Sequence, residues 1–171
     1  MGGRNSPDEQ YNIFKMALDG SGLVQLTNTE WGNYDPCFLP DGRMGMGQRC
    51  GDDGHICGVL HSMKGDGSDV VPLSWHETND RLPFLDNDGM LVYTRWDYID
   101  RTAYEAQGFF KCFPDGRDPR SHHGNYATDD KPFHPMGEFG IRPLVPGGAY
   151  TGKYVAVESG HHSGYYGSLV M

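Results

Sequence analysis

A histidine-rich string near the end of the chain carries the residues best suited to bind a metal. Residues 160–166 include the adjacent histidines His161 and His162, followed by Tyr166. Imidazole is a common ligand of transition metals, and a loop can present two of them together. The string predicts a metal site formed by these three residues, with His61 or Cys37 as further ligands. The alternative is that the histidines hydrogen-bond to neighbouring backbone and hold their loops in place.

A second segment, residues 93–101, combines charged and aromatic side chains. Arg95 and Arg101 can pair with Asp97 and Asp100, because guanidinium and carboxylate form strong paired hydrogen bonds. Trp96 offers a flat packing surface beside them. One interpretation is a clamp for a polar ligand. The other, which the pattern favours, is a salt-bridge latch between neighbouring sheets.

Signals for common catalytic centres are absent from the sequence. It contains no G-x-S-x-G, no phosphate-binding glycine loop and no H-E-x-x-H. His122 and His123 could act as a general base, but no nucleophile stands beside them, so they are counted with Arg95 as candidates for ligand binding. Residues 86–89, D-N-D-G, hint at a calcium loop but lack its later glutamate, and therefore predict a hairpin turn. Cys50 and Cys57 bracket a short loop and could form a disulfide or stay as two free thiols.

The composition predicts an all-β protein rich in turns. Among 171 residues there are 25 Gly, 11 Pro, 10 Tyr and 8 Phe, and Gly or Pro interrupts the candidate helical patterns. The net charge of −9 argues against nucleic acid as a partner, because nucleic acid needs a basic surface. No apolar run approaches the roughly 20 residues of a membrane-spanning helix.

The candidate residues are positioned by an internal repeat of about 47 residues. Five pairs share this spacing: Met16 and Met63, Asp19 and Asp66, Leu26 and Leu73, Pro36 and Pro83, and Gly42 and Gly89. A looser third copy starts at Phe110 and carries an insertion before Lys153.

Each copy contains short β-like runs separated by Asp-Gly pairs, which favour hairpins because glycine accepts positive φ. Four antiparallel strands in a repeat of this length form one blade of a β-propeller. We therefore predict an all-β fold, an incomplete arc of a propeller with about six or seven blades. A β-sandwich is the alternative. The predicted parts are a linker or disordered stretch at 1–10, an outer half-blade at 11–27, blades at 36–74 and 82–121, and a partial blade at 132–171 that begins with a strand at 132–133.

Blade topology places the Asp-Gly turns at one end of the sheets and the longer loops at the other. The longer loops carry Trp31, His76, Asp100, His123 and His162. We therefore expect a small ligand or a protein partner to bind at this loop-rich rim. An open arc leaves the sides of its end blades uncovered, so we also expect the chain to be part of a longer protein.

Several strings resemble known families. L-D-G-S-G-x-x-x-Q-L-T followed by D-P-x-x-L-P-D-G-R is similar to the TolB-like (PD40) propeller repeat. D-P-C-F-L-P-D-G-R, L-V-Y-T-R-W-D-Y-I-D-R and S-G-H-H-S-G-Y-Y-G-S-L-V resemble the middle domain of hydrazine synthase alpha subunits, over roughly residues 11–171. The resemblance implies an exported protein, periplasmic or extracellular, with zinc or haem iron near His161 and His162. Covalent haem would need cysteines at positions 158 and 161, where Glu158 and His161 stand.

Two functions follow from these observations as alternatives. The first is a non-catalytic propeller module that binds a ligand or a protein, or scaffolds a larger enzyme. The second is part of a metal- or haem-dependent oxidoreductase with its site on the histidine-rich rim. A sugar-active hydrolase is a third, weaker alternative, because only Asp97 and Asp100 could supply its two carboxylates.

Overall fold

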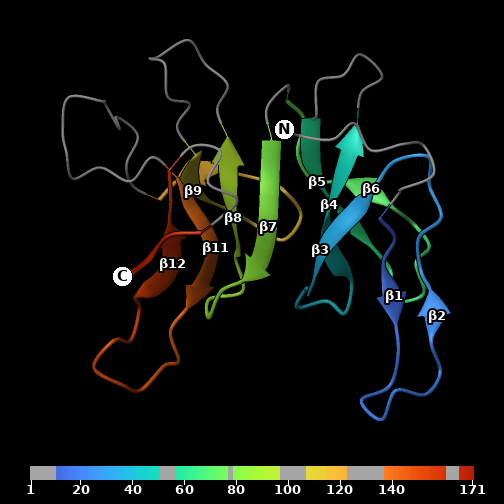
Figure 1. The fold of residues 1–171 in the computed structure, drawn as a ribbon, viewed down its shortest axis with the longest axis horizontal. Helices are drawn as coiled ribbons and strands as arrows, with labels where there is room; N and C mark the ends of the chain where they lie inside the picture. Colours follow the sequence, from blue (N-terminus) through green and yellow to red (C-terminus); the bar gives the residue numbers. More distant parts are fainter. Residues whose placement is uncertain (1–10, 51–56, 77–78, 97–106, 123–136, 161–165) are drawn as a thin grey trace.

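The computed structural model describes residues 11–50, 57–76, 79–96, 107–122, 137–160 and 166–171, and the regular elements in these ranges are β-strands (Figure 1). The described strands form four antiparallel sheets. A two-stranded sheet contains β1 (Phe14–Lys15) and β2 (Val24–Gln25). The first four-stranded sheet contains β3 (Asn33–Phe38), β4 (Met44–Cys50), β5 (Cys57–Met63) and β6 (Val71–Pro72). The second contains β7 (Asn79–Leu85), β8 (Leu91–Trp96), β9 (Gln107–Cys112) and β10 (Arg120–Ser121). The third main sheet contains β11 (Glu138–Pro143), β12 (Tyr154–Glu158) and β13 (Ser168–Val170).

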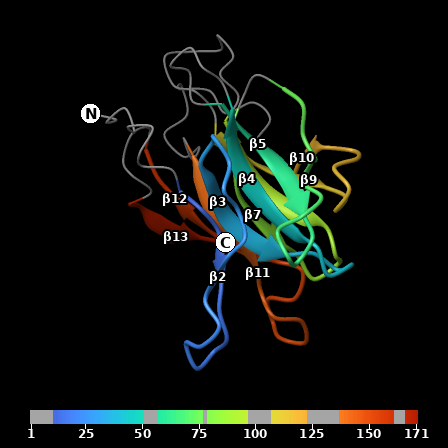
Figure 2. The ribbon, with the colours of Figure 1, turned by 90° about the vertical axis from the view of Figure 1, so that its right-hand side faces the viewer.

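The three main sheets are arranged alike, with their strands following one another in chain order. Their first strands β3, β7 and β11 lie innermost, and β7 contacts both of the others (Figure 1). Figures 1 and 2 both show the β1–β2 turn and the β11–β12 connection extending beyond the same end of the sheets. This arrangement is an open arc of β-propeller blades, so the predicted fold class is confirmed. Within the described ranges no helix has the length and hydropathy to cross a bilayer.

Each innermost strand is interrupted by a β-bulge at the equivalent position. The pairing with the second strand shifts at Tyr34/Cys37, at Arg81/Phe84 and at Phe139/Arg142. The bulges hold Asp35, Leu82 and Gly140 in the left-handed region, at φ of 53°, 55° and 60°. This conformation costs a residue other than glycine about 1–2 kcal/mol. Because the bulge occurs at the same place in each innermost strand, it defines which residues of the three main sheets are equivalent.

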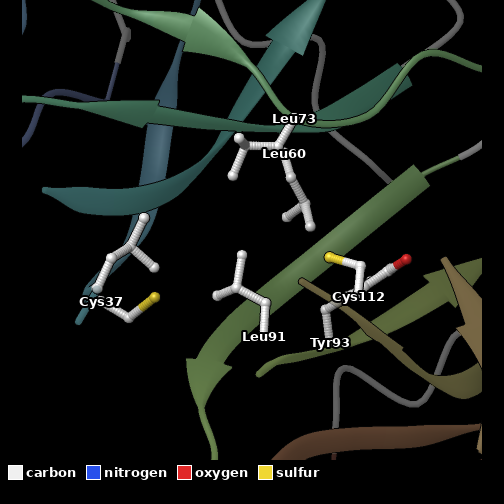
Figure 3. Close-up of a cluster of buried hydrophobic side chains, with 7 residues drawn as sticks. Cys37, Leu60, Leu73, Leu91, Tyr93 and Cys112 are labelled. Carbon is white, nitrogen blue, oxygen red and sulfur yellow. The ribbon is translucent and has the colours of Figure 1, made fainter. Parts of the chain in front are cut away.

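Buried apolar side chains fill the spaces between neighbouring sheets. Between the first and second main sheets lie Cys37, Leu39, Leu60, Leu73, Leu91, Tyr93 and Cys112 (Figure 3). Figure 3 draws Leu91 between the thiols of Cys37 and Cys112. The next residue, Val92, belongs to a second cluster, with Phe109, Ile141 and Ala156 of the second and third sheets. Successive residues of a strand point to opposite faces, so the middle sheet buries both of its faces.

Two glycines allow a hairpin turn of one sheet to contact the preceding sheet. Gly67 after β5 and Gly116 after β9 have φ of +87° and +84°. A Cβ atom on Gly67 would lie 2.1 Å from the carbonyl oxygen of Leu26, and one on Gly116 would lie 2.1 Å from that of Leu73. Leu26 follows β2 and Leu73 follows β6, so the same contact recurs from one sheet to the next.

A polar cluster joins the second main sheet to the third. Lys111 Nζ donates to Asp86 Oδ2 at 2.7 Å and to the Tyr154 hydroxyl at 2.8 Å, and that hydroxyl donates to Asp86 Oδ2 at 2.9 Å. Asp86 Oδ1 accepts the backbone N–H groups of Asp88 and Met90, each at 2.9 Å. The turn at 86–89 is thus the predicted hairpin. Its Asp86 carboxylate binds both Tyr154 of β12 and Lys111 of β9, and so links these two strands.

The described strand that pairs with β12 in the third main sheet differs from the one predicted. The innermost strand of this sheet is β11, Glu138–Pro143, whereas the expected positions 132–133 lie outside the described residues. The prediction followed the prolines that come directly after the bulge residues Asp35 and Leu82. In the third repeat the bulge residue is Gly140 and no proline follows it, so that signal is missing. The second strand coincides with the predicted Tyr154–Glu158.

Candidate ligand-binding rim

The two ends of the sheets differ in how their polar groups are used. At the end formed by the Asp-Gly turns, the aspartates cap their own turns. Asp19 and Asp66 each accept the backbone N–H and hydroxyl of the serine two residues later, at 2.9 and 2.7 Å, and Asp115 accepts the N–H of Arg117 at 3.1 Å. These carboxylates are occupied locally, as expected for tight turns without reactive side chains.

The opposite end, where β3, β7 and β11 begin and β4, β8 and β12 end, is called the rim below. In the second sheet it carries a cluster of His76, Asp80 and Arg95. Arg95 donates through Nε to Asp80 Oδ1 at 2.8 Å and through Nη2 to Oδ2 at 3.0 Å. The Asp80 side chain is fully buried, and that of Arg95 is 13% exposed. Such a two-point pair fixes both groups in direction as well as in distance.

His76 completes this cluster from the loop before β7. Its Nε2 lies 2.7 Å from Asp80 Oδ2 and 3.0 Å from Arg95 Nη2. A guanidinium has no acceptor, so Nε2 donates to Asp80 when it carries a proton and accepts from Arg95 when it does not. Burial raises the pKa of Asp80, but the hydrogen bonds from His76 and Arg95 outweigh it, and the pKa lies below its usual value.

Arg95 is also held by aromatic rings. Its guanidinium carbon lies 4.7 Å from the centre of the Phe110 ring and 5.5 Å from that of Tyr93. These contacts keep the cation in place beside Asp80.

The first sheet carries a neutral version of this cluster at equivalent positions. Gln48 Nε2 donates to Asn33 Oδ1 at 3.0 Å, and Asn33 Nδ2 donates to the Thr29 hydroxyl at 2.7 Å. Asn33 is opposite Gln48 in the strand pairing, as Asp80 is opposite Arg95. Each of these residues precedes its counterpart in the second sheet by about 47 positions.

The third sheet places two acidic residues at this position. Glu138 and Glu158 are directly opposite each other in the pairing of β11 with β12, so their side chains share one face. The Glu138 backbone carbonyl accepts the Thr94 hydroxyl of the second sheet at 2.6 Å. The rim therefore presents an amide pair, an ion pair and an acidic pair at matching places in three neighbouring sheets.

The predicted ligand-binding residues are only partly gathered by the fold. Arg95 pairs with Asp80, which sequence reasoning missed, and Trp96 lies under the Arg81 guanidinium at 5.4 Å. His122 follows the outermost strand β10, with its ring 4.3 Å from Phe109 and 5.3 Å from Tyr154. Asp97, Asp100, Arg101 and His123 lie outside the described residues.

The predicted metal ligands are not brought together where they are described. Cys37 lies in the core between the first and second sheets, whereas His61 is paired with Met46, whose side chain faces the β1–β2 sheet. The two side chains thus lie on opposite faces of one sheet. Tyr166 is 86% exposed, and His161 and His162 lie outside the described residues. In the part of the chain that the structure describes, no three His, Cys, Asp or Glu side chains are close enough together to hold a metal ion.

The cysteines of the core are protonated thiols. Burial raises the pKa of Cys37 to about 11 and that of Cys112 to about 12. Cys50 and Cys57 are opposite each other in the pairing of β4 with β5. Their side chains lie outside the described set, so the disulfide and the two free thiols both stay open as predictions.

Comparison with known proteins supports the fold. No family model matches the chain, and no curated protein matches it. Among solved structures, the chain is similar to a protein assigned as TolB from Agrobacterium tumefaciens, with a TM-score of 0.53 and 22% sequence identity over 67% of this chain. The match covers 41% of that protein, so the chain spans less than half of its length. The comparison therefore supports a TolB-like β-propeller fold for the part of the chain that it covers.

Proposed function

We propose that this chain is a binding module with a β-propeller fold, and that a small ligand or a protein partner binds at the rim. The difference between the two ends of the sheets carries the proposal. At the turn end the carboxylates cap their own loops, whereas at the rim polar pairs occupy matching positions in three neighbouring sheets. The resemblance found in the sequence adds export to the periplasm or the outside of the cell as part of the proposal.

The three rim clusters differ in charge, which would give the module its selectivity. A ligand lying across the rim would meet the amide of Gln48 on the first sheet and the carboxylate of Glu158 on the third. Asp80 and Arg95 are largely buried, so they would support the surface and not touch the ligand. Glu158 is half-buried and would favour a cationic group of the ligand, whereas Glu138 opposite it is buried.

The oxidoreductase alternative rests on His161, His162 and the family resemblance. The described residues add no support to it, because Cys37 and His61 lie on opposite faces of their sheet. We therefore favour the binding module.

Nuclear magnetic resonance of the full chain tests the proposal. Small cationic compounds and short basic peptides are first screened by thermal shift, and the amide resonances are then followed during titration. We expect changes at Gln48, Trp96 and Glu158, and none at the turn glycines Gly20 and Gly67.

Two variants make this test specific. Glu158→Gln should weaken binding about tenfold, as the loss of one charged hydrogen bond would. Asp41→Asn removes a charge from the turn end and should leave binding unchanged. A rim site would be contradicted if the amide resonances that change on titration lie at the turn end. It would also be contradicted if the affinity falls equally in both variants.

A further inference from the structure

Three side chains from the innermost strands occupy one level of the arc, directly after the three bulges. Cys37, Phe84 and Arg142 are equivalent in the strand pairing, each being the first residue after the register shift. The Arg142 guanidinium carbon of β11 lies 4.1 Å from the centre of the Phe84 ring of β7. The Arg142 side chain thus extends over the neighbouring strand, towards β3.

A carboxylate lies near Arg142 without pairing with it. Asp35 of β3 and Arg142 are close enough to affect each other's pKa, and Arg81 of β7 also acts on Asp35. Burial is the largest influence on both groups: it raises the pKa of Asp35 and lowers that of Arg142. Asp35 accepts the backbone N–H of Leu82 at 3.3 Å and forms no ion pair with Arg142.

Arg142 differs from other arginines of the described ranges in its hydrogen bonds. Arg43, Arg95, Arg117 and Arg120 each lie within 2.8 Å of a carboxylate oxygen. Arg142 donates through Nη1 to the carbonyl of Ile141 at 2.8 Å and forms no ion pair with a described residue. A guanidinium has five N–H donors, so most of its donor capacity is available to a ligand. A planar cation stacked on a ring and partly removed from water is well suited to bind a carboxylate.

We propose that Arg142, held against Phe84, binds the carboxylate group of a ligand on the inner-strand surface of the arc. A planar carboxylate matches the fork of the guanidinium, which can donate two parallel N–H groups to its two oxygens. Phosphate would bring a second negative charge towards Asp35. Arg142 lies four residues beyond Glu138 along β11, about 13 Å from the rim. The site therefore stands independently of the proposed rim ligand.

Binding of acetate to the full chain tests this site directly. Acetate is titrated at constant ionic strength against chloride, with calorimetry and thermal shift as readouts. We expect saturable binding that falls at least about tenfold in Arg142→Gln and less in Arg142→Lys, which keeps the charge but loses the fork. The matched control is Arg117→Gln, because Arg117 also stacks on a ring, Phe113 at 5.5 Å, but lies on the surface and is paired with Asp115.

A variant with the opposite expected effect keeps the test decisive if Arg142→Gln fails to fold. Asp35→Asn removes the competing carboxylate and should strengthen acetate binding, and asparagine tolerates the positive φ of this position. A short acidic peptide and inorganic phosphate form two further arms. Tighter Arg142-dependent binding of the peptide would identify a peptide carboxylate as the source, and binding of acetate alone would identify a free acid. The proposal would be overturned if acetate does not bind, or if its affinity is the same in Arg142→Gln or Asp35→Asn as in the wild type. Tighter binding of phosphate than of acetate would also overturn it.

Discussion

At the scale of single residues, the rim shows that one position in the blade accepts different chemistry. The first sheet holds Asn33 and Gln48 there, and the second holds Asp80 and Arg95. One member of each pair, Asn33 or Asp80, is fully buried and hydrogen-bonded to its partner, but only the second pair requires charge compensation. A buried carboxylate that loses its partner has neither water nor a cation to stabilise it, so the ion pair constrains the second sheet more than the amide pair constrains the first.

Replacing Arg95 should therefore destabilise the fold strongly. Arg95→Ala leaves the fully buried Asp80 with one partner fewer and should lower the free energy of unfolding by about 3–5 kcal/mol. Urea denaturation followed by tryptophan fluorescence measures the change. Arg117→Ala breaks an exposed pair with Asp115 and should have little effect. Equal losses in the two variants would show that the buried pair has no special role.

The neutral cluster of the first sheet supplies a rescue for this loss. The triple variant His76→Thr, Asp80→Asn, Arg95→Gln copies Thr29, Asn33 and Gln48 into the second sheet and should recover most of the stability. It should also change the response to acid. The pKa of Asp80 is lowered in the folded state, so its contribution is present above the unfolded value of about 3.9 and is lost as the pH falls through the lower folded value. Between pH 5 and pH 3, roughly, the wild type should lose more stability than the triple variant.

The sequence allowed part of this cluster to be predicted. Arg95 was recognised as a pairing residue, but its partner was sought at Asp97 and Asp100, close by in the chain. Asp80 is opposite Arg95 only because the two strands are joined by the hairpin at 86–89 and one bulge shifts their register. A usable signal was present, since polar pairs stand at similar distances on either side of both Asp-Gly hairpins, Asn33 with Gln48 and Asp80 with Arg95.

At the scale of elements, the hairpin turns do more than reverse the chain. The turns at Gly67 and Gly116 touch the preceding sheet, whereas the turn at Gly42 has open space where its Cβ would be. The three glycines have nearly the same φ, between +83° and +87°. Comparing substitutions at Gly42 and Gly67 therefore distinguishes the free-energy cost of a positive φ from the cost of a clash with the preceding sheet.

Substitution by alanine should expose this difference. Gly42→Ala should lower the free energy of unfolding only by the cost of its positive φ, about 1–2 kcal/mol. Gly67→Ala adds a clash with the Leu26 carbonyl and should lose about 1–3 kcal/mol more. Thermal or urea unfolding measures both. If the two variants are equally destabilised, the turn at Gly67 does not hold the sheets together.

Among the elements, the strands of the first two main sheets could be predicted because each stands beside an Asp-Gly turn at a constant spacing. β11 could not be predicted in the same way. The repeat lengthens before it, and Gly140 takes the place where the earlier repeats have a residue followed by proline. A pattern search based on proline therefore does not find β11.

At the scale of the whole molecule, burial is uneven along the arc. The middle sheet has neighbours on both faces, and Leu91, Val92, Tyr93 and Thr94 of β8 are each at most 1% exposed. The short strands β1 and β2 lie at one end of the arc, where Phe14 and Val24 are about half exposed. The fold class at this scale followed directly from the repeat, because a sheet with two buried faces needs neighbours built like itself.

Hydrogen exchange should follow this gradient. Amides of β8 should exchange most slowly, because they open only with the whole sheet, and those of β1 and β2 should exchange fastest among the strands. Exchange measured by mass spectrometry on peptides covering residues 11–27 and 88–96 gives the comparison. Equal protection in the two segments would show that the arc opens as a single cooperative unit.

The contact made by the turn glycines has a direction along the chain. Leu26 is synthesised before Gly67, and Leu73 before Gly116. Each turn therefore packs against a residue that has left the ribosome earlier. A nascent chain that acquires structure from its first residues onward can thus seat each new sheet as soon as that sheet exists. In this order of assembly, the residues that each turn contacts are always synthesised before the turn itself. A newly formed sheet therefore never has to remain undocked until its contact residues are made.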